Sequence, residues 1–153
     1  MKLYLVRHGE ADSKEVNPER PLTPQGRADV EVVAKAAADR ITALGAIWHS
    51  PKLRARQTAE ILAGHIPADA ALVERDDLVD GPVGQVARDV ESAAGDLMIV
   101  SHIPFLPKLA GKLIEGDEDA QPLAFPAGGL ACLEADDAMN WTLAWTMGPG
   151  EVT

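Results

Sequence analysis

The chain has little of what several common classes of protein need. Cysteine occurs once among its 153 residues, at Cys132, so no internal disulfide can form. No apolar stretch approaches the roughly 20 residues that a membrane-spanning helix requires. Met1 and Lys2 lead directly into an apolar run, without the charged and then apolar segments of an export signal. We therefore expect a soluble, cytoplasmic protein in which Cys132, itself within an apolar run, packs in the core.

Basic residues are also scarce. Lys and Arg number 14 against 24 Asp and Glu, which gives a net charge of -10 and an isoelectric point near 4.7. Such a charge disfavours general binding to nucleic acid or to an anionic membrane, so neither is an expected partner. Several arginines nevertheless lie in the loops after predicted strands. Arg7, Arg54 and Arg56 are close to strand ends, and Arg20 is in the loop after the first strand. Cations gathered in this way on an acidic protein indicate a specific small anion as the ligand.

Apolar runs that end abruptly in polar side chains are the most informative pattern in the sequence. The runs and the side chains that follow them are 3–6 with Arg7 and His8, 46–48 with His49 and Ser50, and 97–100 with Ser101 and His102. In open α/β sheets, ligands bind beyond the carboxyl ends of the strands, so polar groups placed there face a site and not a core. The recurrence predicts that these strand ends come together around a ligand.

The remaining segments alternate between helical and strand-like patterns. Helices are expected from Thr23-Pro24 to Gly45, from Ser50-Pro51 to about Ala63, over 83–94 and over 104–115. Pro107 indicates either an irregular first turn in the last helix or a start one turn later. Strands are expected at 71–73, 129–134 and 141–147, the last two as a hairpin. This order predicts an α/β fold: a three-layer α/β/α sandwich with a mainly parallel, mixed sheet, in a single domain over residues 1–153.

The side chains at the predicted strand ends suit phosphoryl transfer, which needs a nucleophile and positive donors for the phosphoryl oxygens. His8 can act as the nucleophile, with Arg7, Arg54 and His102 as donors that hold the group without a metal or cofactor. Arg54 falls in the first turn of its predicted helix, where a cation is unfavourable unless an anion offsets it. Nearby cations lower the pKa of His8 and keep it neutral, while its other ring nitrogen donates to a backbone carbonyl. A bound phosphate would instead favour protonated His102.

Several motifs resemble, in order, those of a known enzyme family. They are LVRHGE at 5–10, RPLTPQG at 20–26, SPKLRARQTA at 50–59 and VSHIP at 100–104. The pattern resembles the histidine phosphatase superfamily, which has the phosphoglycerate mutase-like fold, and the short chain is similar to its SixA-type phosphohistidine phosphatases. The resemblance implies that His8 is the phosphorylated nucleophile and that Arg7 and Arg54 clamp the phosphate. It makes His102 the second histidine of the pocket and places Arg20 at the pocket's edge.

The general acid is less clearly marked than the nucleophile. Larger branches of this superfamily place a carboxylic acid after the middle of the chain, where this sequence has an acidic run over 74–82. Asp77 or Asp80 is the candidate, with a solvated acidic loop as the alternative. If the substrate is phosphohistidine, its imidazole leaves already protonated, so a dedicated acid matters less. Arg56, His49 and His65 are expected to be structural or solvated side chains.

The predicted function is a metal-independent phosphatase that forms a phosphohistidine intermediate and acts on protein phosphohistidine. A small-molecule phosphomonoesterase of the same fold, acting on sugar or nucleotide phosphates, is one alternative. A phosphate-binding module without catalysis is another. A zinc hydrolase built on His8, His49 and His102 is disfavoured, because the neighbouring arginines would repel a metal cation. The expected partner is therefore a phosphorylated protein or a small phosphate ester.

Overall fold

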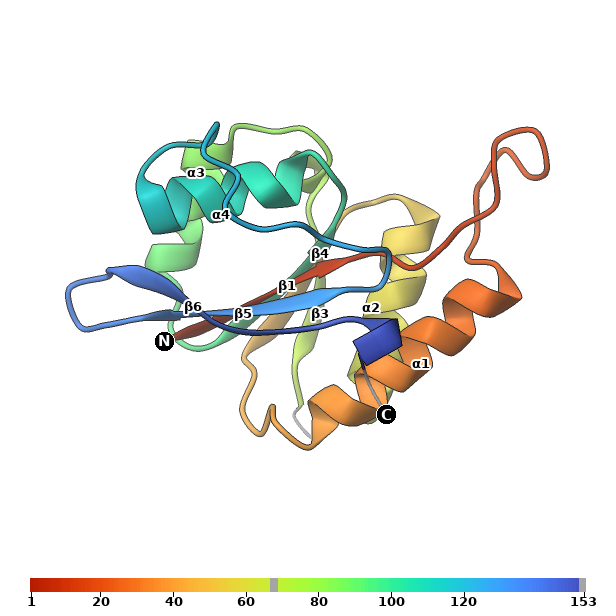
Figure 1. Cartoon of the computed structure of the whole chain (residues 1–153), viewed down its shortest axis with the longest axis horizontal. Coiled ribbons are helices and arrows are strands. Elements are labelled where there is room, and N and C mark those ends of the chain that lie inside the picture. Colours follow the sequence, from red (N-terminus) through yellow and green to blue (C-terminus); the bar gives the residue numbers. More distant parts are fainter. Residues whose placement is uncertain (67–68, 152–153) are drawn as a thin grey trace.

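The structure of the chain is a computed structural model that describes residues 1–66 and 69–151 (Figure 1). Within these residues, six strands form one sheet in the order β3-β2-β4-β1-β5-β6. The strands are β1 (Lys2–Arg7), β2 (Ala46–His49), β3 (Ala71–Glu74), β4 (Leu97–Ser101), β5 (Leu130–Ala135) and β6 (Trp141–Met147). The helices are α1 (Pro24–Ala38), α2 (Leu53–His65), α3 (Val83–Glu91) and α4 (Phe105–Glu115), with short 3₁₀ helices at Asp76–Leu78 and Pro149–Glu151.

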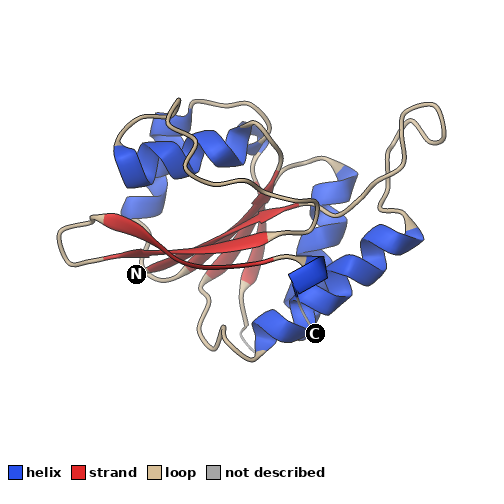
Figure 2. Ribbon diagram, viewed as in Figure 1, coloured by secondary structure: helices blue, strands red, loops and turns tan. Residues whose placement is uncertain are grey.

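The sheet lies between two layers of helices, α1 and α2 on one face and α3 and α4 on the other (Figure 2). Side chains along β1 alternate between the two faces because successive residues of a strand point in opposite directions. Leu3 and Leu5 pack with the α3 and α4 side, whereas Tyr4 and Val6 pack with the α1 and α2 side. All four side chains are buried, since helices cover both faces of the strand.

Strand direction brings the ends of β1, β2 and β4 to one edge of the sheet. These strands are parallel neighbours, with Arg7 opposite Ser101 and His49 opposite Val100. The later strands β5 and β6 add to β1 as an antiparallel hairpin. The predicted α/β sandwich with a mainly parallel, mixed sheet is therefore confirmed, and the polar residues after the three apolar runs lie at adjacent strand ends.

The predicted helix boundaries need correction in three places. Helix α1 ends at Ala38 and not at Gly45, although Ile41 and Leu44 beyond it are buried. The apolar spacing continued past the helix because the connecting turn also packs against the core. Helix α2 begins at Leu53, after Ser50-Pro51 and not on it, with Lys52 as its N-cap and no side chain capping it. Helix α3 ends at Glu91, before the predicted end at residue 94.

Two other local expectations bear on the core. Helix α4 begins at Phe105, so it does not start one turn late, and Pro107 is its third residue. Proline has no backbone N–H to donate, but N–H groups in the first turn of a helix have no intrahelical acceptor, so no hydrogen bond is lost. Cys132 on β5 is fully buried, as expected, and burial raises the pKa of its thiol to about 11. Among the described residues, no helix combines the length and apolarity that a membrane crossing requires.

Candidate active site

His8 lies directly after β1, at the carboxyl edge of the sheet. Its backbone N–H donates to the Ser101 carbonyl at 3.1 Å, which holds the end of β1 against the end of β4. Its ring Nδ1 lies 2.8 Å from the Gly9 carbonyl oxygen. A carbonyl can only accept, so Nδ1 carries the proton and Nε2 keeps its lone pair. The contact with Gly9 fits the predicted tautomer, in which the lone pair of Nε2 is free.

His102 follows β4 and faces His8, with the two ring centroids 5.0 Å apart. Its Nε2 lies 2.6 Å from the hydroxyl of Ser50, which is fully buried after β2. That hydroxyl accepts from the backbone N–H of Lys52 at 3.3 Å. No other acceptor for the hydroxyl proton is found in the described part of the chain, so Ser50 donates to Nε2. The ring proton of His102 is then on Nδ1, which is the donor left for a ligand.

Arg7 and Arg54 supply cations beside the two rings. Arg7, the last residue of β1, donates from Nη1 to the Phe125 carbonyl at 2.9 Å. Arg54 is the second residue of α2, where the helix already carries partial positive charge. The Nε atoms of both arginines are buried and have no hydrogen-bond partner among the residues that the structure describes. Buried donors are normally satisfied, so this pair indicates the place of an anionic ligand.

Burial and the surrounding cations keep both histidines neutral. Burial is the larger cause that lowers the pKa of His8 to about 4, and Arg54, Arg7 and Arg20 lower it further against the raising effect of the Gly9 carbonyl. Burial likewise lowers the pKa of His102 to about 3, with His8 and Arg54 as the next causes. The sequence predicted the effect of the arginines on His8 and missed the larger effect of burial.

Thr58 joins the two halves of the site and was not predicted. Its hydroxyl accepts from the Gly9 N–H at 3.1 Å and donates to the Arg54 carbonyl at 2.8 Å, so the turn after β1 is held against α2. A Cβ on Gly9 would come within 2.8 Å of Val30 on α1, which explains why this crowded turn has glycine. The available signal was a threonine on the apolar face of a predicted helix, one turn after Arg54.

Arg20 lies near the site on the loop between β1 and α1. Its Nε donates to the Asp12 carbonyl at 2.9 Å, and its backbone has a positive φ of 51°. Burial lowers the pKa of Arg54, and the neighbouring cation Arg20 lowers it further. The structure thus gathers Arg7, His8, Arg54 and His102 at one sheet edge, with Arg20 beside them.

Other residues considered from the sequence lie elsewhere. Arg56 is exposed, and His65 pairs with Glu31 on α1. His49 is buried, and its Nδ1 lies 3.0 Å from the Ser50 carbonyl. Within residues 1–66 and 69–151, no three His, Cys, Asp or Glu side chains are grouped as metal ligands would be.

Sequence comparison decides the family. A profile of the histidine phosphatase superfamily (branch 1) matches residues 3–89, more than half of the chain. The chain belongs to the histidine phosphatase superfamily. The predicted family, its phosphoglycerate mutase-like fold and the class of phosphoric hydrolases are thereby confirmed.

Relatives within the superfamily include SixA proteins. Phosphohistidine phosphatase SixA of Escherichia coli (strain K12) is 26% identical over 157 residues, covering 97% of this chain and 94% of the relative. A solved structure of the protein histidine phosphatase SixA complexed with tungstate has a TM-score of 0.87 at 24% identity and full coverage, 100% of each chain. Phosphoserine phosphatase from Entamoeba histolytica, in complex with 3-phosphoglyceric acid, shares the fold with a TM-score of 0.75 at 16% identity over 99% of each chain.

The two acids considered for a superfamily general acid have different surroundings. Both oxygens of Asp77 accept from Arg75, at 3.0 and 2.6 Å, and Arg75 also pairs with Asp89 at 2.7 Å. A carboxylate held in this way is a structural partner of Arg75, because proton donation would break a bidentate ion pair. Asp80 is exposed and lines a hollow beside α3 and α4 with Lys108. Asp77 is therefore engaged with Arg75, whereas Asp80 is open to solvent.

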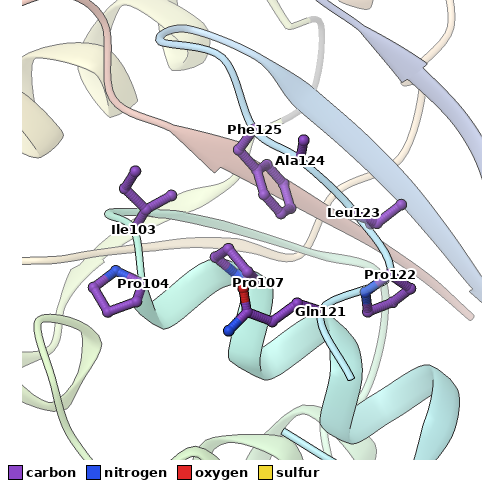
Figure 3. Close-up of a pocket in the computed structure, with 8 residues that line it drawn as sticks. All are labelled: Ile103, Pro104, Pro107, Gln121, Pro122, Leu123, Ala124 and Phe125. Carbon is purple, nitrogen blue, oxygen red and sulfur yellow. The ribbon is translucent and has the colours of Figure 1, made fainter. Parts of the chain in front are cut away.

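An apolar pocket of about 710 Å³ borders the site on the α4 side (Figure 3). Its walls are Ile103, Pro104 and Pro107 from the start of α4, and the loop from Gln121 to Phe125 opposite them. Ile103 follows His102, and the Phe125 carbonyl accepts from Arg7, so the pocket lies next to the site.

Proposed function

We propose that the protein is a metal-independent phosphatase that transfers a phosphoryl group from protein phosphohistidine to His8 and then to water. One observation carries this proposal. The buried Nε atoms of Arg7 and Arg54, which lack partners in the described residues, lie beside two neutral histidines whose rings are 5.0 Å apart. Cations and ring N–H groups gathered in this way suit a phosphoryl group, and each hydrogen bond to a charged group contributes about 1.5–3 kcal/mol.

The first step forms a bond between Nε2 of His8 and phosphorus. The P–N bond of the substrate breaks, and its electron pair returns to the leaving imidazole nitrogen. A phosphohistidine ring that is protonated on its other nitrogen leaves as neutral imidazole, so no general acid is needed. Arg7, Arg54 and the Nδ1–H of His102 hold the three phosphoryl oxygens as charge shifts between donor and acceptor.

The second step releases phosphate. A water molecule attacks phosphorus, the bond to His8 Nε2 breaks, and its electron pair returns to the ring nitrogen. The proton lost by water passes to the departing phosphate or to solvent. The Gly9 carbonyl keeps the other nitrogen, Nδ1, protonated throughout, so the ring returns to the tautomer with which it began.

Two observations favour protein phosphohistidine as the substrate. The full-length match to a phosphohistidine phosphatase of Escherichia coli covers the whole site. Asp77 is engaged with Arg75 and is not free to protonate an alcohol leaving group, whereas a P–N bond does not need such an acid.

A small phosphate ester is a second candidate substrate. The apolar pocket of about 710 Å³ has the size of many small-ligand sites and adjoins the site beside Arg7 and His102. It would accommodate the organic part of an ester whose phosphate lies against the arginines. Rates with phosphohistidine peptide, sugar phosphates and nucleotide phosphates, measured on one enzyme preparation, separate the two candidates.

The decisive experiment is to trap the intermediate. We expect ³²P-labelled phosphohistidine, quenched in alkali during turnover, to leave acid-labile and alkali-stable label on His8. Peptide mapping locates the label, and His8→Asn provides the control that cannot carry it. A fully competent enzyme without label at His8 contradicts the mechanism, and a wild-type protein that binds phosphate but never turns over is a binding module.

A further inference from the structure

A second hollow, of about 560 Å³, borders the site on the side away from α4. It lies between the loop 11–22 and the start of α2, and we call it the basic hollow. The charged side chains that line it are Lys14, Glu19, Arg20, Lys52, Arg54 and Arg56. The loop projects from the body of the molecule beyond the end of β1 (Figure 1). Arg54 belongs both to the candidate active site and to this hollow, so the two adjoin at this residue.

The basic hollow has an excess of positive charge on an acidic protein. Among the described residues, five cations and one carboxylate line it, although the whole chain has a net charge of -10. None of these cations forms a salt bridge within residues 1–66 and 69–151. Elsewhere the chain does neutralise an arginine, since Arg75 pairs with both Asp77 and Asp89. The excess is therefore local, and it suits an anionic ligand from outside the chain.

The backbone of Arg20 supports a binding role for this hollow. Its φ of 51° lies in the left-handed region, which is uncommon for residues other than glycine. Hydrogen bonds hold it there, from its N–H to the Asn17 carbonyl at 2.9 Å and from its Nε to the Asp12 carbonyl at 2.9 Å. A strained backbone persists only where the surrounding contacts hold it in place. Residues of this kind are common at ligand sites.

The size and spread of the cations indicate what the ligand is. Arg54 is shared with the candidate active site, whereas Lys14 is exposed on the loop and Lys52 and Arg56 are exposed at the start of α2. One phosphate fills little of a hollow of about 560 Å³, but a chain segment with several carboxylates can reach all of its cations. Because Arg54 lines both the hollow and the site, a segment in the hollow can belong to the molecule whose phosphoryl group lies in the site.

We propose that the basic hollow binds an acidic segment of the protein that carries the phosphohistidine, so the enzyme prefers phosphohistidine flanked by aspartate or glutamate. This inference rests on the proposed function and specifies its substrate. Screening acts over about 8 Å at physiological salt, so the preference weakens as salt is raised. Complementary charge of this kind mainly raises the association rate and lowers KM, with little effect on kcat.

The test compares two phosphohistidine peptides of equal length, one with Asp and Glu around the phosphohistidine and one with Ser and Gln. At low salt, the wild-type enzyme is expected to have a kcat/KM about tenfold higher for the acidic peptide, through KM. In the double variant Lys14→Ala, Arg56→Ala this ratio falls toward one. The matched control Arg88→Ala, Lys112→Ala, which removes two cations from exposed positions on α3 and α4, keeps the wild-type ratio.

Equal rates of the wild-type enzyme on both peptides overturn the inference, as does an unchanged ratio in the Lys14 and Arg56 double variant. Free phosphohistidine distinguishes these results from failure of the proposed function. If the wild-type enzyme hydrolyses free phosphohistidine but ignores flanking charge, only the inference is lost. If it hydrolyses neither the peptides nor free phosphohistidine, the proposed function and the inference both fail.

Discussion

The ends of β1 and β4 have the same position in the fold and different hydrogen bonding. Each is a central parallel strand followed by a histidine, and each histidine has a lowered pKa because it is buried among cations. His8 is fixed through Nδ1 by the carbonyl of the next residue, a local contact. His102 is fixed through Nε2 by Ser50, which comes from the end of β2. Opposite ring nitrogens are thus left free: Nε2 of His8, with a lone pair, and Nδ1 of His102, with a proton.

The largest effect is expected at the end of β1. His8→Ala removes the proposed nucleophile, so kcat/KM for a phosphohistidine peptide is expected to fall by about 10³-fold or more. Circular dichroism checks that the variant is folded, and the same assay measures the rate. Retention of the wild-type rate would show that the lone pair of His8 is not used and that the two strand ends do not differ in the proposed way.

A smaller effect is expected at the end of β4. His102→Ala removes a donor to the phosphoryl oxygens, and kcat falls by about 10²-fold. Because the nucleophile remains, labelled phosphate still accumulates on His8, and the quench experiment measures it. Loss of labelling in a folded His102 variant that still binds phosphate would mean that the two rings share the first step.

Substitutions of Ser50 test the orientation of the His102 ring without removing a group that contacts the ligand. Ser50→Ala leaves Nε2 of His102 buried without its partner, so the ring tautomer is no longer fixed and kcat falls by about tenfold. Ser50→Thr keeps the hydroxyl and is expected to recover most of the rate. A pH profile of kcat that is identical in wild type and Ser50→Ala would argue that the hydroxyl has a packing role only.

Acid pH tests the neutral state of both rings. The pKa of His8 is about 4, so kcat/KM is expected to hold down to about pH 5 and to fall as pH decreases through 4, when the nucleophile is protonated. The folded pKa values lie below the ordinary 6.5, so the unfolded chain binds more protons. Stability is then fully present above pH 6.5 and decreases below it. Urea unfolding from pH 7 to 4 measures this, and His8→Asn should flatten the decrease.

The smallest effect concerns the contact that holds the β1 end against α2. Thr58→Val keeps the shape but removes the hydroxyl that accepts from Gly9, and the free energy of unfolding should fall by about 1–3 kcal/mol. Thr58→Ser retains the hydroxyl and is expected to lose less. Equal destabilisation of the two variants in urea unfolding would assign the effect to packing and not to the hydrogen bond.

The sequence predicts best what depends on strand order and worst what depends on contacts between segments. Arg7, His8 and His102 follow apolar runs, and parallel strands place such ends together. Ser50 instead looked like a helix cap, because nothing local shows that its hydroxyl bonds a ring 52 residues away. Thr58 was missed for the same reason. The end of α1 was wrong because burial of Ile41 and Leu44 continues the helical spacing after the helix has stopped.

Cys132 has a practical consequence for the laboratory. Its sulfur lies in the core, and the high pKa of the thiol leaves almost no thiolate at neutral pH. Thiolate is the form that reacts with maleimides, iodoacetamide and peroxide, so the native enzyme should tolerate all three. A cysteine introduced on the projecting loop could therefore carry a fluorophore selectively, without first replacing the natural one, and would report directly on docking of a phosphorylated protein.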